Sequence, residues 1–199
     1  MKRRSIGALA IAIVLGGAAV YGMVLIHHGF SARDEPSSIE AWTARRVRRL
    51  AIPSGARNLK DPVPRSPAAI REGMQHFADH CATCHANNGR GDTEMGRNLY
   101  PKAPDMKAAE TQNLSDGELY YIIQNGIRMS GMPAWGKPGD LSDEESWKLV
   151  QFIRHLPSLT QKEESEMKRW NPLSPQEQKN QREEEDFLSG SETAAPHKH

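Results

Sequence analysis

The stretch "DHCATCHANNGRGD", from Asp79 to Asp92, contains both cysteines of a 199-residue chain. Cys81 and Cys84 have the spacing C-x-x-C, and His85 follows directly. Three kinds of site use such a pair of cysteines: a structural zinc site, a redox-active dithiol and a covalently attached haem. The rest of the sequence must distinguish between them.

Zinc and dithiol chemistry are the weaker alternatives. A structural zinc site needs four nitrogen or sulfur ligands. No paired spacing that would complete such a set occurs among the remaining histidines, which are His27, His28, His76, His80, His155, His197 and His199. A thioredoxin-like dithiol lies at the start of a helix within a strand–helix–strand pattern, and the sequence shows no alternating strand pattern.

Covalent haem attachment uses all three residues of the motif. The two thiols add across the haem vinyl groups, and the adjacent imidazole ligates the iron from one face. The five-residue motif lets both sulfurs and the imidazole reach one rigid macrocycle from a single helical turn. The sequence therefore predicts one haem c, bound through Cys81 and Cys84, with His85 as an iron ligand.

Residues 1–30 are predicted to be a signal anchor. Lys2, Arg3 and Arg4 precede an uncharged run from Ser5 to Ile26. The run of about 22 residues can cross a hydrocarbon core of about 30 Å, whereas a cleavable signal usually has an apolar region of about 7 to 15 residues. Because positive charge stays inside, we expect a single-pass protein of the cytoplasmic membrane with its haem domain on the periplasmic (extracytoplasmic) side. A cleaved signal peptide is the alternative.

Residues 31–65 are predicted to be a basic, proline-containing linker with one short amphipathic helix. The linker carries eight Arg and Lys residues against four Asp and Glu residues. Ser37 followed by Glu40 has the form of a capping box. One side of the helix is apolar, with Ile39, Trp42 or Thr43, Val47 and Leu50. This stripe either lies on the membrane surface or packs on the following domain.

Residues 66–157 are predicted to form an all-α domain. Three main helices follow from capping residues and apolar stripes: Ser66–Cys81, Ser115–Asn125 and Ser142–Leu156. In the second and third helices, Glu118 and Glu145 complete the capping pattern. A domain of roughly 90 residues has a small core, and a buried haem would supply the missing apolar mass.

A second iron ligand is expected from a methionine, because a soft thioether favours reduced iron in electron-transfer sites. Met132 is the first candidate, since "SGMPAWG" places it in a loop fixed by Gly and Pro after a helix. Met129, three residues earlier in the same loop, is the alternative. The other methionines are interpreted as packing residues.

Together these residues resemble the class I cytochromes c. The resemblance covers roughly Pro67 to Pro157 and rests, in order, on "GMQHFADHCATCHANNGRGD", "LYPKAPDM", "LSDGELYYIIQNGIRMSGMPAWG" and "WKLVQFIRHLP". It implies the cytochrome c fold, with three main helices and loops around one covalent haem after the transmembrane helix. It also implies attachment at Cys81 and Cys84, with His85 and Met132 as axial ligands.

The resemblance carries further expectations. Gly73 and Phe77 should meet the C-terminal helix near Trp147 and Val150. A proline carbonyl commonly accepts a hydrogen bond from the proximal histidine, and such contacts orient the ligand. Pro101 is the expected counterpart, with Pro104 close by. Ala86 departs from the pattern, because many members have glycine there.

The charged tail, residues 158–199, is predicted to be disordered, with a short helix around residues 160–170. It has few apolar residues and a run of glutamates at 183–185. Trp170 and Phe187 are the two aromatic residues that could dock on the domain.

Function follows from the predicted site. Two axial ligands leave no open position for a substrate, so the expected chemistry is one-electron exchange at the haem edge. We predict a membrane-tethered monohaem electron carrier between respiratory-type redox proteins, and not an enzyme by itself. A fixed haem subunit of a membrane dehydrogenase or oxidase complex is the first alternative, and a haem peroxidase or gas sensor the second. The formal net charge is +1, and nucleic acid is not among the predicted partners.

Overall fold

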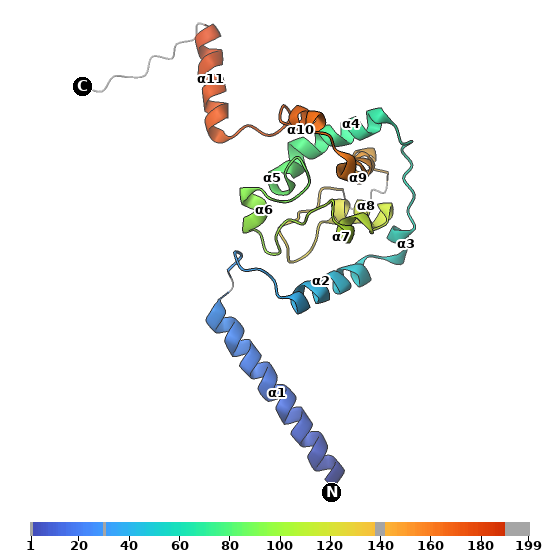
Figure 1. Cartoon of the computed structure of the whole chain (residues 1–199), viewed down its shortest axis with the longest axis vertical. Coiled ribbons are helices and arrows are strands. Elements are labelled where there is room, and N and C mark those ends of the chain that lie inside the picture. Colours follow the sequence, from blue (N-terminus) through green and yellow to red (C-terminus); the bar gives the residue numbers. More distant parts are fainter. Residues whose placement is uncertain (1, 30, 138–141, 190–199) are drawn as a thin grey trace, which may run out of the picture.

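The computed structural model describes residues 2–29, 31–137 and 142–189, and the regular structure in these ranges is helical throughout (Figure 1). The predicted all-α class is therefore confirmed. The elements are α1 (Lys2–His28), α2 (Ser38–Ala51), α3 (Ser54–Arg57), α4 (Pro67–His76), a π-helical turn (Phe77–Cys81), α5 (Ala82–His85), α6 (Glu94–Asn98), α7 (Ala109–Gln112), α8 (Asp116–Asn125), α9 (Glu144–His155), a 3₁₀ turn (Leu156–Ser158), α10 (Gln161–Met167) and α11 (Pro175–Ser189).

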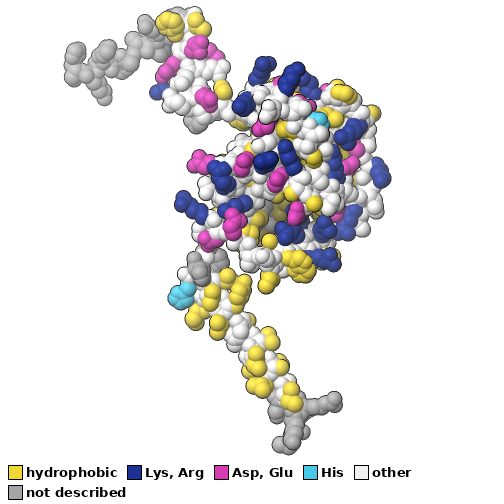
Figure 2. All heavy atoms as spheres, viewed as in Figure 1, with side chains coloured by type: hydrophobic (Ala, Val, Ile, Leu, Met, Phe, Trp, Pro, Cys, Tyr) yellow, Lys and Arg dark blue, Asp and Glu magenta, His cyan; other side chains and the backbone are white. Residues whose placement is uncertain are grey.

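Helix α1 projects away from the domain that the later helices form (Figure 1). Its segment Ile6–His27 has 22 residues with a mean hydropathy of 2.5, and none of it is buried. Hydrophobic side chains cover this helix in Figure 2. At about 1.5 Å per residue, the helix is long and apolar enough to cross a membrane.

Helices α4 and α9 pack closely against each other at Gly73. A Cβ atom added to Gly73 would lie 2.1 Å from the carbonyl oxygen of Lys148, so only glycine allows the two backbones to approach this far. The Phe77 ring, which is fully buried, lies 5.1 Å from the Phe152 ring. The expected meeting of Gly73 and Phe77 with the C-terminal helix is confirmed.

The first predicted helix consists of two parts. Ser66 caps α4, because its hydroxyl accepts a hydrogen bond of 3.0 Å from the backbone N–H of Ala69. The α-helix ends at His76, and the π-helical turn carries the chain on to Cys81. Such turns widen a helix locally and are frequent at functional sites.

Helix α8 has the predicted ends. Ser115 and Glu118 form the complete capping box, and Gly126 closes the helix with a φ of 66°. For α9 the predicted cap was wrong: Asp143, and not Ser142, accepts the hydrogen bond from the backbone N–H of Glu145. A carboxylate at this position also interacts favourably with the positive end of the helix dipole.

The domain core lies between α4, α8 and α9. The rings of Tyr120 and Trp147 stack with centroids 4.2 Å apart. The largest fully buried side chains are those of Trp147, Tyr120, Phe77, Phe152, Leu156, Met167 and Val150. Met167 belongs to the segment after the predicted domain, so the core extends into the tail.

The tail contains the predicted short helix, which is α10 (Gln161–Met167), but residues 158–171 are more ordered than predicted, while residues 190–199 lie outside the described residues. Thr160 and Glu163 form a capping box for α10, the side chain of Met167 is fully buried, and the Asn171 amide donates a hydrogen bond of 2.8 Å to the carbonyl of Ala78. Sequence composition missed this docking because only a few residues of a largely polar segment make the contacts. Residues 158–171 are therefore part of the folded domain.

The two aromatic residues of the tail behave differently. Trp170 packs against the core, and the Arg71 guanidinium lies 5.7 Å from its ring centroid. Phe187 is exposed on α11, a helix whose described side chains are all exposed. Only Trp170 docks on the domain.

Candidate haem site

The three residues of the C-x-x-C-H motif lie where the π-helical turn meets α5. Contacts from the loop that follows fix their backbone. Thr93 donates its hydroxyl proton to the carbonyl of Cys84 at 3.1 Å, and the N–H of Gly91 donates to the carbonyl of His85 at 2.8 Å. A Cβ atom at Gly96 would lie 2.2 Å from the Cys84 carbonyl oxygen. The motif is thus held in one backbone conformation.

The His85 imidazole is buried and uncharged at neutral pH. Burial lowers its pKa to about 4, and the Pro104 carbonyl acts in the opposite direction. Its Nδ1 atom is buried and makes no hydrogen bond of good geometry within the described structure. The Pro104 carbonyl is therefore close enough to affect the pKa of the ring, but it is not aligned to accept a hydrogen bond from Nδ1.

This geometry favours Pro104 over Pro101 as the proline beside the proximal histidine. Both prolines are exposed, but the proline carbonyl that acts on the His85 ring is that of Pro104. The motif "YPKAP" contains both prolines, and spacing alone could not distinguish between them.

The two thiols are protonated at neutral pH. Burial and the adjacent Cys84 raise the pKa of Cys81 to about 12, and burial also raises the pKa of Cys84. A redox-active dithiol has a lowered thiol pKa, which is the opposite of what is found here. Among the described residues, no group of three or more His, Cys, Asp or Glu side chains is arranged to hold a metal ion.

The loop after α8 holds Met132 in place by hydrogen bonds. The N–H of Ile127 donates to the Met132 carbonyl at 3.1 Å, and the N–H of Met132 donates to the Ser130 hydroxyl at 3.2 Å. Further along, the N–H of Trp135 donates to the carbonyl of Ile123 on α8 at 3.1 Å. Both ends of the loop are therefore tied to the end of one helix.

Within this loop, burial favours Met132 over Met129. Met132 is half-buried, whereas Met129 is 92% exposed and has a φ of 61°. A side chain at the tip of a turn that points into solvent is poorly placed to ligate a buried iron. The structure thus supports the first of the two methionine candidates.

Three segments meet at the site. The rings of His80 and Trp135 lie 5.5 Å apart, which brings the methionine loop beside the cysteine motif. A Cβ at Gly131 would meet the Leu99 side chain at 2.6 Å. The N–H of Ala103 donates to the Gly96 carbonyl at 3.0 Å. These contacts place three segments side by side at the candidate site: residues 80–85, 96–104 and 131–135.

Sequence analysis did not identify the supporting residues Gly91, Thr93, Gly96 and Leu99. The segment "GRGDTEMG" carries closely spaced glycines, and Gly89 and Gly91 both have positive φ values. Such a cluster of glycines signals a close backbone approach, and it could have predicted that this loop packs on the motif.

The residues present fit a covalent haem c. Two protonated thiols stand one turn apart, a neutral imidazole with a buried and unsatisfied nitrogen follows them, and a half-buried thioether lies in a loop packed beside the motif. Thiols, imidazole and thioether are the donor set of a c-type haem with two axial ligands.

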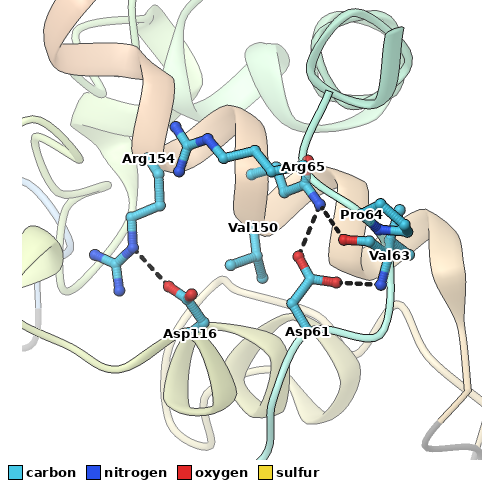
Figure 3. A pocket seen from close by; sticks show the side chains of 8 residues that line it. Asp61, Val63, Pro64, Arg65, Asp116, Val150 and Arg154 are labelled. Atoms are coloured by element: carbon cyan, nitrogen blue, oxygen red, sulfur yellow. Dashed lines mark hydrogen bonds and ion pairs between the residues drawn. The ribbon is translucent and has the colours of Figure 1, made fainter. Parts of the chain in front are cut away.

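A separate pocket lies between the linker, α8 and α9 (Figure 3). Inside it, the side-chain amide of Gln151 donates to the Asp61 carboxylate at 2.8 Å and to the Val63 carbonyl at 2.9 Å. Arg154 pairs with Asp116 at 2.8 Å. None of its lining residues belongs to the cysteine motif or the methionine loop. The two Gln151 hydrogen bonds hold the linker on the domain, and the Arg154–Asp116 pair joins α9 to α8.

Comparison with known proteins identifies the class. A family model described as "Cytochrome C oxidase, cbb3-type, subunit III" matches residues 68–153. This segment contains the C-x-x-C-H motif, the methionine loop, helix α8 and most of helix α9. The helical domain is therefore a c-type cytochrome of class I, as the resemblance predicted.

Relatives in this class are larger proteins. The chain is 35% identical over 89 residues to the cbb3-type cytochrome c oxidase subunit FixP of Azorhizobium caulinodans, covering 40% of this chain and 25% of that protein. It is 34% identical over 94 residues to FixP of Rhizobium meliloti, covering 47% of this chain and 29% of that protein. A thiosulfate dehydrogenase of Stutzerimonas stutzeri is 27% identical over 92 residues, with coverage of 46% and 29%. The chain thus spans less than a third of these relatives.

Proposed function

We propose that this protein is a membrane-tethered, monohaem c-type cytochrome that passes single electrons between redox proteins. The observation that carries the proposal is the placement of the half-buried Met132 loop beside the Cys81-x-x-Cys84-His85 motif. In this arrangement one haem would have a protein ligand on each face. The bound haem would supply one-electron chemistry, with the iron alternating between the ferric and ferrous states.

The roles of the side chains follow from their environment. Cys81 and Cys84 would anchor the haem through thioether bonds, and the neutral His85 would ligate the iron. The Pro104 carbonyl would orient the imidazole by accepting a hydrogen bond from Nδ1 once the ring settles on the iron. Met132 would close the remaining position. With no open position for a substrate, the domain would not be an enzyme by itself.

The N-terminal helix supports the tether. α1 is long and apolar enough to span a bilayer, and Lys2, Arg3 and Arg4 precede its apolar segment. By the positive-inside rule, the haem domain would lie on the periplasmic side of the cytoplasmic membrane. This topology agrees with haem attachment outside the cytoplasm.

A second candidate is a fixed haem subunit of a larger membrane complex. The matched family model is described as subunit III of a cbb3-type oxidase, and one of the relatives is a thiosulfate dehydrogenase. The description as an oxidase subunit supports a role beside a catalytic partner. The same haem site would then serve one partner permanently instead of moving between two.

Redox titration of the full chain, purified from membranes in detergent, tests the proposal. We expect one haem per chain, a one-electron Nernst curve and no rapid carbon monoxide binding by the ferrous protein. Rapid carbon monoxide binding would instead support a gas sensor or peroxidase. Native electrophoresis of gently solubilised membranes separates the two candidates: a carrier migrates alone, whereas a subunit migrates with its complex.

A further inference from the structure

Helix α2 presents its apolar side to solvent. The exposed fractions are 78% for Ile39, 63% for Trp42, 57% for Val47 and 76% for Leu50. The sequence left open whether this stripe packs on the domain or lies on a membrane. In the structure it does not pack on the domain.

The opposite side of α2 faces the domain. Ala41 and Arg48 are half-buried, and Ile52, directly after the helix, is only 3% exposed. Their spacings of seven and four residues place all three on one side of a helix. This side lies about half a turn from Ile39 and Leu50, so the attachment to the domain fixes the apolar stripe in an outward orientation.

Polar contacts strengthen this attachment. Glu40 accepts a hydrogen bond from the Tyr100 hydroxyl, and Lys102 pairs with Glu35, just before the helix, at 2.6 Å. Tyr100 and Lys102 belong to the loop that runs past the haem site. The position of α2 is therefore linked to the site itself.

Basic side chains border the exposed stripe. Arg45, Arg46 and Arg49 are exposed on α2, and the spacing of four between Arg45 and Arg49 places these two on one side. Figure 2 shows hydrophobic and basic side chains next to each other along the lower edge of the domain, where α2 lies. Apolar side chains flanked by arginines are the composition of helices that bind anionic membrane surfaces.

The anchor keeps α2 near the bilayer. α1 ends at His28 and α2 begins at Ser38. Even fully extended, residues 29–37 reach only about 30 Å. In Figure 1, α2 lies on the side of the domain nearest α1.

We propose that α2 docks on an anionic lipid surface, with Ile39, Trp42 and Leu50 in the interface and Arg45 and Arg49 at the lipid phosphates. A bilayer is favoured over a partner protein because the membrane anchor precedes the helix directly. Docking would hold the haem site at a fixed height and orientation above the membrane. The inference rests on the proposed anchoring by α1, but not on electron transfer.

Spin labelling of the full chain in lipid vesicles tests this docking. In the haem-loaded protein, Cys81 and Cys84 would be consumed by thioether bonds, so Ile39→Cys introduces the single free thiol for a nitroxide. Phe187→Cys is the matched control, because Phe187 is also 78% exposed but lies on α11. In vesicles with phosphatidylglycerol, dissolved oxygen should relax the label at 39 more than a water-soluble nickel chelate does. The label at 187 should show the reverse.

Charge provides a second test. Arg45→Gln and Arg49→Gln should each weaken docking about fivefold. This factor corresponds to about 1 kcal/mol, the contribution of one basic residue at an anionic membrane surface. Vesicles of phosphatidylcholine alone should weaken docking more than either substitution does, because they lack the anionic lipid that both arginines would contact. The unchanged visible spectrum of the variants would show that the domain is folded.

Three outcomes would contradict either the docking of α2 on lipid or the anchoring by α1 on which it rests. A label at 39 that is as accessible to the nickel chelate as the label at 187 excludes lipid docking. A label shielded only in native membranes, and not in vesicles, assigns α2 to a partner protein instead. A chain that fails to enter the vesicle fraction refutes the anchoring itself, which is a different result from an anchored chain with an exposed label.

Discussion

The rings of His80 and Trp135 lie 5.5 Å apart, and this contact joins the residue before Cys81 to the residue three positions after Met132. The two segments are separated by more than one helix along the chain. The aromatic contact therefore helps to set where the methionine loop closes over the site.

Replacing Trp135 should loosen this loop. An aromatic contact of this kind contributes about 0.5 to 1.5 kcal/mol beyond burial, so Trp135→Ala should make cyanide binding to the ferric protein up to about tenfold tighter. Trp135→Phe should behave nearly as the wild type. Absorbance titration with cyanide measures the effect, and equal affinities in all three proteins would show that the contact does not hold the loop.

The two methionines of the loop should differ sharply. Met132→Ala should keep the haem attached but open the iron to cyanide and carbon monoxide, abolish the far-red ferric sulfur band and lower the reduction potential. The loss of a soft thioether and the entry of water both disfavour ferrous iron. Met129→Ala should change little, because Met129 is almost fully exposed. The reverse pattern in spectroscopy and redox titration would make Met129 the ligand.

The contact between α4 and α9 should not tolerate a side chain at Gly73. In Gly73→Ala the new methyl group would overlap the Lys148 carbonyl, and such overpacking costs about 1 to 3 kcal/mol or more. Gly55→Ala is the control, because nothing lies within 4 Å of a Cβ there. Denaturant unfolding should show a large loss only for Gly73→Ala. Equal stability of the two variants would mean that the helices can separate without cost.

The docked tail should stabilise the domain. Met167 is fully buried, and replacing a buried methionine with alanine costs about 2 to 5 kcal/mol. Phe187→Ala, at an exposed position, should change the free energy of unfolding by about 0.5 kcal/mol or less. If Met167→Ala unfolds at the same denaturant concentration as the wild type, residues 158–171 do not belong to the cooperative unit.

Local sequence patterns predicted where the helices begin and end, but they predicted fewer of the contacts between the helices. Ser66, Ser115 and the apolar stripe from Trp147 to Leu156 lie where the sequence placed them, because capping and periodicity act within a few residues. The cap at Asp143 was missed since Ser142 and Asp143 both have side chains suited to capping. The docking of Met167 was missed because composition cannot show that a single apolar residue in a polar segment fills a gap in the core.

At the candidate haem site, too, local features were predicted and tertiary contacts were not. The C-x-x-C-H spacing predicted the three proximal residues, whereas the choice between Pro101 and Pro104 depended on how the loop folds back on His85. The exposed side of α2 likewise depended on tertiary packing. Ala41, Arg48 and Ile52 face the domain, and hydrophobicity alone would have placed the arginine in solvent and the stripe of Ile39, Trp42 and Leu50 inside.

Intact mass of the denatured full chain tests the central claim most directly. If Cys81 and Cys84 hold a haem through thioether bonds, the chain should be heavier by one haem after extraction with acidified acetone, and Cys81→Ser or Cys84→Ser should greatly lower the yield of haem-loaded protein. A wild-type chain that has the mass of the polypeptide alone, with its haem recovered in the acetone, would contradict the account.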